Sequence, residues 1–179
     1  VLSNLMNHTL ASISQDFSPD DNCEPCAGGL MVRLPFTRAT FFFPSGKEIN
    51  WEPAFQTHIA TNNVFFYSLQ WVGEWLAAYQ AKQDLQYLSR AVQAVSSYLR
   101  YVESGAVGNN TINIRSSDHS SSIRIRVFIK LLHLSRGQQV VNPDLQRDIL
   151  RHLLYLAEWT FDPENFKMSN HGLMSSIAR

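Results

Sequence analysis

The sequence predicts an all-α fold preceded by an irregular N-terminal arm. From about residue 62 the apolar residues recur at intervals of three and four, and short polar segments with Gly or Pro divide that pattern into separate helices. The chain has 179 residues, of which 45% are hydrophobic, so it can bury a sizeable core. We therefore divide it into an aromatic-rich arm, residues 1–50, and a helical domain, residues 51–179.

The arm, residues 1–50, shows no helical period. Its segment "DFSPDDNCEPCAGG" is rich in turn residues, and the aromatic segment that follows is interrupted by Pro35, Pro44 and Gly46. We expect an irregular arm with at most a short strand, which lies against the helical domain through Phe36 and residues 41–43.

The first two helices are predicted to form an antiparallel hairpin. The first starts at about residue 62, and its apolar face consists of Phe65, Leu69, Val72, Leu76 and Tyr79. Asp84 is the expected N-cap of the second, whose stripe consists of Leu85, Leu88, Val92, Val95, Leu99 and Val102. Because the break at residues 81–83 is short, the two helices must run in opposite directions.

The second half of the domain predicts a further pair of helices and the start of another. The segment at about 119–135 is apolar on two faces, which predicts a helix buried between neighbours. Gly137 ends it, and Asn142 with Pro143 begins the next helix. The stripe of this fourth helix consists of Leu145, Ile149, Leu153 and Leu156. A fifth helix is expected to begin near Asn170.

Charge and hydropathy limit the possible partners. The formal net charge is +0, from 15 Lys and Arg against 15 Asp and Glu, which argues against nucleic acid as a partner. No apolar run reaches the roughly 18 to 20 residues that a membrane-spanning helix needs. We therefore expect no nucleic-acid partner and no membrane span.

The two cysteines, Cys23 and Cys26, have CxxC spacing. Such a pair could serve redox chemistry, supply half of a zinc site or close a small disulfide loop, and the turn-rich flanks favour a structural or incidental pair. No second CxxC and no nearby His cluster completes a zinc site. The sequence therefore predicts no metal and no other cofactor.

Four stretches together carry a resemblance to a known family. They are "INWEP" (49–53), "FFYSLQWVGEWLAAY" (65–79), "SDHSSSIRIRVFIKLL" (117–132) and "SNHGLMSSIA" (169–178). In this order the set resembles the N-terminal helical domain of heparinase II/III-like proteins and related alginate lyases, over roughly residues 40–179. The resemblance implies helical hairpins that form part of an incomplete α/α toroid, which in the family precedes a β-sandwich.

The resemblance also implies a reaction and two catalytic residues. Asn170 and His171 match an Asn-His pair of the family, which lies at a helix start and contacts the carboxylate of a uronic acid. β-Elimination removes the C5 proton of a uronate, so negative charge develops on the adjacent carboxylate and must be stabilised by hydrogen-bond donors. An Asn amide supplies such a donor without titrating, whereas His can also move a proton near neutral pH.

Four further residues are candidates for substrate binding. Asp118 and His119, with Arg124 after them, resemble a second family segment, although the family's preceding aromatic is replaced here by Arg115 or Ser116. His119 could contact substrate or bond to Asp118, and Arg124 could meet a sugar carboxylate or pair with an acid. Trp71 and Trp75, one turn apart, could line a sugar-binding cleft or pack in the core.

Two functions of different class follow. In the first, the chain is the N-terminal fragment of a polysaccharide lyase that acts by β-elimination on a uronate-containing acidic polysaccharide. The family's Tyr acid/base and a further His lie downstream of the Asn-His helix, so this chain alone is expected to be inactive. In the second, the chain is a non-catalytic helical module that binds glycan or serves as a scaffold.

One expected partner is an acidic polysaccharide. The other is the protein segment that covers the apolar faces of the helices at about 119–135 and 143–156. Truncation of a toroid leaves apolar faces uncovered, so we expect contact with a missing C-terminal part of the chain or self-association. A periplasmic or extracellular location is expected for a protein of this kind.

Overall fold

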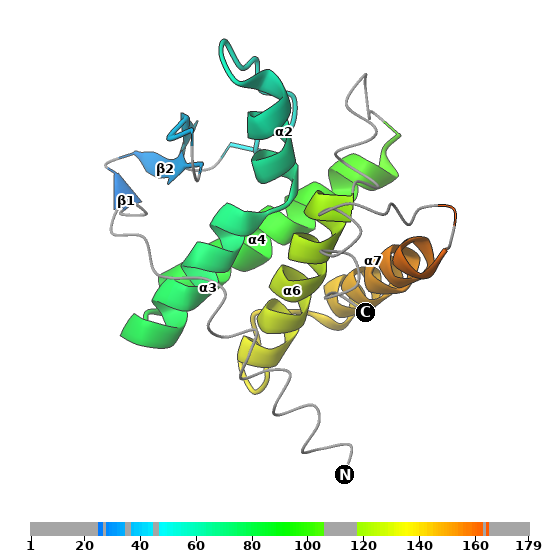
Figure 1. The fold of residues 1–179 in the computed structure, drawn as a ribbon. Coiled ribbons are helices and arrows are strands. Elements are labelled where there is room, and N and C mark those ends of the chain that lie inside the picture. Colours follow the sequence, from blue (N-terminus) through cyan, green and yellow to red (C-terminus); the bar gives the residue numbers. More distant parts are fainter. Residues whose placement is uncertain are drawn as a thin grey trace.

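The computed structural model describes residues 25–26, 28–34, 37–44, 47–105, 118–162 and 164. Most of these residues are helical, which confirms the predicted fold class. The helices of the described residues are α2 (Ile59–Tyr67), α3 (Gln70–Lys82), α4 (Leu85–Glu103), α6 (Asp118–Leu134) and α7 (Pro143–Phe161). Figure 1 shows α6 crossing in front of α4, with α7 on one side and α3 on the other.

The arm contains more regular structure than we expected. Strands β1 (Pro25–Cys26), β2 (Gly29–Arg33) and β3 (Thr40–Pro44) form one antiparallel sheet in the order β1-β2-β3. A Cβ at Gly29 would collide with the Phe43 carbonyl oxygen, so the close approach of β2 to β3 requires glycine there. The continuous aromatic run in β3 hides the alternation that usually identifies a strand in a sequence.

The sheet packs on the helices through aromatic rings of β3. Phe43 is buried and stacks on Trp71 with 5.9 Å between ring centroids, and Phe41 lies 5.2 Å from Phe66. Phe42 points to the other face and is 47% exposed. Two of the aromatic residues expected to hold the arm therefore do so, whereas Phe36 lies outside the described residues.

The helix predicted from residue 62 is two helices, α2 and α3, which are separated at Ser68 and Leu69. Leu69 has φ 61°, and the Ser68 hydroxyl accepts a hydrogen bond from the Gln70 amide at 3.2 Å. The periodicity does not reveal this break because apolar side chains on both sides of it face the same core. The predicted stripe is nevertheless buried: Phe65, Leu69, Val72, Leu76 and Tyr79.

Helices α3 and α4 are joined by Gln83 and Asp84 and pack against each other. Asp84 caps α4 as predicted, because its carboxylate accepts a hydrogen bond from the Gln86 amide at 2.9 Å. Of the predicted α4 stripe, Leu88, Val95 and Leu99 are buried, but Leu85 is half exposed.

Helix α6 lies at the centre of the helical part and contacts α2, α3, α4 and α7. Of the two apolar faces predicted, one is buried through Ile123, Val127 and Leu131, whereas on the other Phe128 is buried and Ile125 and Ile129 are only partly buried. The α6–α7 connection contains Gly137 at φ 76°.

Helix α7 begins as the sequence predicted. The Asn142 side chain caps it by accepting a hydrogen bond from the Leu145 amide at 2.8 Å, and Pro143 occupies the first turn.

Within the part of the chain that the structure describes, none of the helices combines the length and apolar character that crossing a membrane would require.

Candidate functional site

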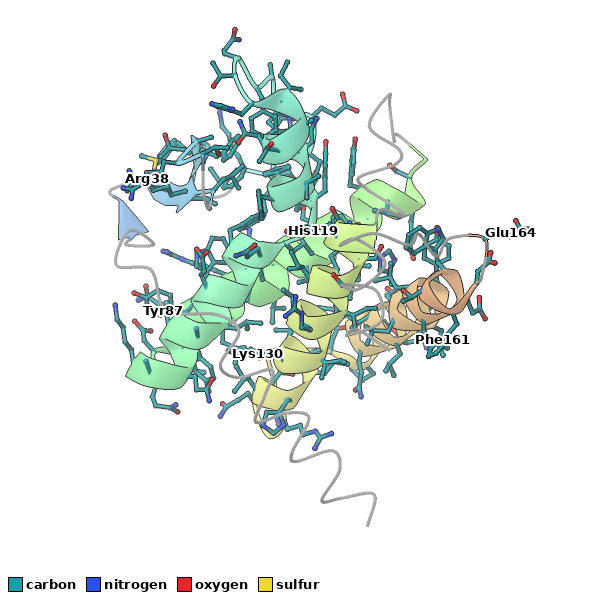
Figure 2. The ribbon with its side chains drawn as sticks, viewed as in Figure 1. Arg38, Tyr87, His119, Lys130, Phe161 and Glu164 are labelled. Atoms are coloured by element: carbon teal, nitrogen blue, oxygen red, sulfur yellow. The ribbon has the colours of Figure 1, made fainter. Side chains whose placement is uncertain are left out.

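The start of α6 is the candidate site, because it carries His119, a residue that the sequence singled out. His119 is the second residue of the helix and is only partly buried. Figure 2 shows it at the end of α6 that lies next to α2. Its ring meets the Phe65 ring edge to face, with 5.9 Å between centroids and 90° between planes. Phe65 therefore limits the positions that the imidazole can take.

Buried hydroxyl groups fix this helix start against α2. Ser120, Ser121 and Ser122 are consecutive and all buried. The Ser120 hydroxyl donates to the Val64 carbonyl at 3.2 Å, and the Ser122 hydroxyl donates to the His119 carbonyl at 2.9 Å. Because serine side chains are small, the backbones of α2 and α6 can approach closely at this point. The first turn of α6, and with it His119, is therefore held in place.

Arg124, predicted to contact substrate, lies in the interior with no exposed surface. Its Nη1 donates to the Tyr67 carbonyl at 2.8 Å, at the end of α2, and its guanidinium lies over the Tyr98 ring at 5.6 Å. Burial lowers the pKa of Arg124, although an arginine remains charged in proteins. Arg124 thus connects α6 to α2 and α4, and in this conformation it cannot contact a sugar carboxylate.

The tryptophans predicted as possible cleft residues also belong to the core. Trp71 and Trp75 are buried and meet each other edge to face, with ring centroids 4.9 Å apart. Trp71 Nε1 donates to the Phe66 carbonyl at 2.9 Å, and the same indole stacks on Phe43. Neither ring reaches the surface in this conformation, so the two tryptophans pack in the core, which is one of the two uses that the sequence allowed.

Sequence reasoning missed the buried amides of α2. Asn62 and Asn63 are buried, and Asn62 Nδ2 donates to the Thr57 carbonyl at 2.8 Å. The Thr37 hydroxyl also bonds to Asn62 Oδ1, which connects the arm to α2. Adjacent asparagines inside the apolar segment "IATNNVFFY" were the signal that could have revealed them.

The remaining predicted residues cannot be compared with this geometry. Asn170, His171, Cys23 and Arg115 lie outside the described residues, so the Asn-His pair stays a prediction. Asp118 is the first residue of α6. Among the described residues, no group of three or more His, Cys, Asp or Glu side chains could hold a metal ion.

The site at the start of α6 thus combines a partly exposed imidazole with the N-terminus of a helix. That helix end carries a partial positive charge, which the carboxylate of Asp118 at its first residue partly offsets, and the imidazole can donate or accept a proton. Both groups are fixed by buried contacts, which is what a binding or catalytic site needs.

No family model matches this sequence, and no curated protein or solved structure matches it either.

Proposed function

We propose that this helical region is part of a polysaccharide lyase that cleaves a uronate-containing acidic polysaccharide by β-elimination. The observation that carries the proposal is the start of α6, where His119 is held partly exposed at a helix N-terminus. The resemblance of residues 117–132, which include His119, and of residues 169–178 to two segments of heparinase II/III-like proteins also supports it.

The proposed reaction requires groups that stabilise charge and move a proton. A base takes the C5 proton of the uronate, and the electron pair of the C5–H bond forms the C4–C5 double bond. The C4–O bond breaks at the same carbon pair, and the leaving oxygen takes up a proton. In this proposal Asn170 donates to the carboxylate on which charge develops, and His171 contacts the same sugar. His119 binds an adjacent part of the substrate or transfers a proton.

The placement of Arg124 changes its proposed role. It is a positioning residue, because its hydrogen bond to the Tyr67 carbonyl holds α6 against α2 and thereby fixes His119, five positions earlier in the same helix. In α6, contact with an anionic sugar would then come from the helix start and His119, in addition to the contacts of Asn170 and His171.

The proposal includes the arrangement of helices that the resemblance implies, antiparallel hairpins in an incomplete α/α toroid. The short connections between α3 and α4 and between α6 and α7 support such pairs.

The decisive experiment is an assay for lyase activity with the complete protein. Alginate, heparin-type and other uronate polymers are supplied, and the unsaturated product is followed by its ultraviolet absorbance. His119→Ala is expected to lower kcat by roughly 10²- to 10⁴-fold, the usual contribution of a group that transfers a proton. His133→Ala, which removes an exposed histidine from the same helix, serves as the matched control and should leave kcat unchanged.

The alternative is a non-catalytic helical module that binds glycan or serves as a scaffold, and the burial of Arg124, Trp71 and Trp75 fits the scaffold, because it leaves these side chains no contact with a sugar. Retention of an acidic polysaccharide without any unsaturated product would support this module and contradict the lyase. Equal activity of His119→Ala and His133→Ala would remove His119 from the proposed site.

A further inference from the structure

An apolar groove of about 460 Å³ lies between α6 and α7. It is lined by Ile125 and Ile129 of α6 and by apolar side chains of α7 that include Leu150, Leu154, Ala157 and Phe161. Leu154 is 66% exposed and Phe161 58% exposed. Exposed apolar side chains that gather in one groove indicate a docking surface.

Helix α7 has two apolar faces, and in the part of the chain that the structure describes one is buried whereas the other keeps exposed side chains. Leu145, Ile149 and Leu156 are buried. The groove residues Leu150, Leu154, Ala157 and Phe161 recur at intervals of four, three and four, which places them in a second stripe along the helix. A helix with two apolar faces is typically packed on both, so the groove is expected to receive another segment.

We propose that the occupant of the groove is the chain's own segment 170–179. Its sequence, "NHGLMSSIAR", predicts a short amphipathic helix in which Leu173, Met174 and Ile177 share one face. Three apolar side chains on one face of a helix are the pattern that fits an apolar groove between two helices.

The length of the connection fits this occupant. The groove includes Phe161, the last residue of α7, and residues 162–169 join it to the segment. Eight residues can span up to about 27 Å, enough to reverse direction. Ten helical residues are about 15 Å long, close to the roughly 17 Å from Leu150 to Phe161 along α7.

Tethering also favours this segment over a second copy of the chain. A segment attached by a short connection has an effective concentration in the millimolar range near the groove, far above that of another molecule in dilute solution. We therefore expect the docked state to be independent of protein concentration.

The docked segment lies close to the candidate site. Ile125 of the groove is six positions after His119, which corresponds to about 9 Å along the axis of α6. Docking on this residue brings segment 170–179 near the start of α6. The inference does not depend on the lyase proposal, because docking can be measured without any substrate.

Thiol reactivity tests the docking. In the full chain with Cys23→Ser and Cys26→Ser, Leu154→Cys places one thiol in the groove, and its rate of reaction with a soluble maleimide is measured. Adding Ile177→Asp, which charges the apolar face of the segment, should raise that rate by at least about tenfold, because the groove then opens to solvent. Ser175→Asp adds the same charge on the opposite face and should leave the rate low.

Two controls make the result unambiguous. Arg147→Cys, on an exposed part of α7 outside the groove, should react at one rate whichever residue occupies position 177. Far-ultraviolet circular dichroism checks that each variant folds, and Leu150→Cys, which is also exposed in the groove, replaces Leu154→Cys if that variant does not fold.

A thiol that reacts equally fast with Ile177 and with Ile177→Asp would overturn the proposal. Protection that increases with protein concentration would also overturn it and identify a second copy as the occupant.

Discussion

At the residue scale, burial separates side chains that the sequence presents as equivalent. His119 and Arg124 both belong to a polar pattern near a helix start, yet His119 is partly exposed whereas Arg124 is buried. Arg124 is fixed by the Tyr67 carbonyl and the Tyr98 ring, two groups that lie far from it in the sequence. Residue type and spacing therefore do not separate these two side chains, whereas the contacts show that Arg124 belongs to the core and His119 reaches the surface.

The burial of His152 predicts how the stability of the protein depends on pH. The His152 ring is buried next to Tyr98, Phe128 and Tyr155, and burial, with a smaller contribution from the charge of Arg124, lowers its pKa to about 3. Between that pKa and the usual 6.5 the unfolded chain binds a proton that the folded chain does not. The free energy of unfolding should therefore fall as the pH decreases through this range, by up to about 1.4 kcal/mol per pH unit.

The measurement is urea denaturation of the wild type and of His152→Phe at several pH values between 3 and 7. The other titratable groups contribute equally to the pH dependence of both proteins. The difference between the two free energies of unfolding, followed against pH, therefore isolates the effect of His152. The stability of His152→Phe relative to wild type should increase as the pH falls. A pH-independent difference would contradict the lowered pKa, because His152 would then bind protons equally in the folded and unfolded chains.

At the element scale, the sequence predicts how helices begin better than how they break. Asp84 and Asn142 cap their helices through side-chain hydrogen bonds that depend only on local geometry. Leu69 and Gln83, by contrast, adopt left-handed backbone conformations without being glycine. Leu69 is buried, so its side-chain packing stabilises a conformation that its own backbone disfavours.

The left-handed backbone conformation of Gln83 predicts that glycine at this position stabilises the end of α3. Gln83 is exposed, has φ 55° and ends α3, a position at which glycine is normally preferred. Gln83→Gly should raise the free energy of unfolding by about 0.5–1 kcal/mol, because glycine adopts this conformation without steric cost. Thermal or urea denaturation measures the change.

Gln80→Gly is the matched control for this substitution, because Gln80 is also exposed but lies inside α3. It should lower the free energy of unfolding by about 1 kcal/mol. Two changes of the same sign would contradict the assignment of Gln83 to the end of the helix.

At the scale of the whole molecule, one face of the small sheet holds the arm on the helices. Phe43 of β3 stacks on Trp71, and Trp51, which follows the sheet, donates through Nε1 to the Ser97 hydroxyl at 2.9 Å. Trp71 also contacts Trp75 and Trp51, so the aromatic rings form one cluster that extends from the sheet to α4. The arm and the helices therefore share a hydrophobic core.

We predict that Phe43→Ala lowers the free energy of unfolding by about 3 kcal/mol, because it removes a buried ring and leaves a cavity next to Trp71. Phe42→Ala, one position away on the exposed face of the same strand, should change it by less than about 1 kcal/mol. Urea denaturation followed by tryptophan fluorescence measures both. Equal losses for the two variants would contradict the packing of the sheet through a single face.

The sequence by itself determined the helical class, the capped starts of α4 and α7, and the central position of α6. These features follow from periodicity and local hydrogen bonding, which are properties of residues close together in the chain. It also pointed to His119, because Asp118, His119 and Arg124 resemble a segment of heparinase II/III-like proteins.

Only the tertiary structure decided the break between α2 and α3, the three-stranded sheet, and the burial of Arg124, Trp71 and Trp75. Each of these depends on contacts between residues distant in the sequence: Arg124 with Tyr67, and Phe43 with Trp71. A buried arginine and a substrate-binding arginine have the same spacing in a helix, and they differ only in what the rest of the chain places around them.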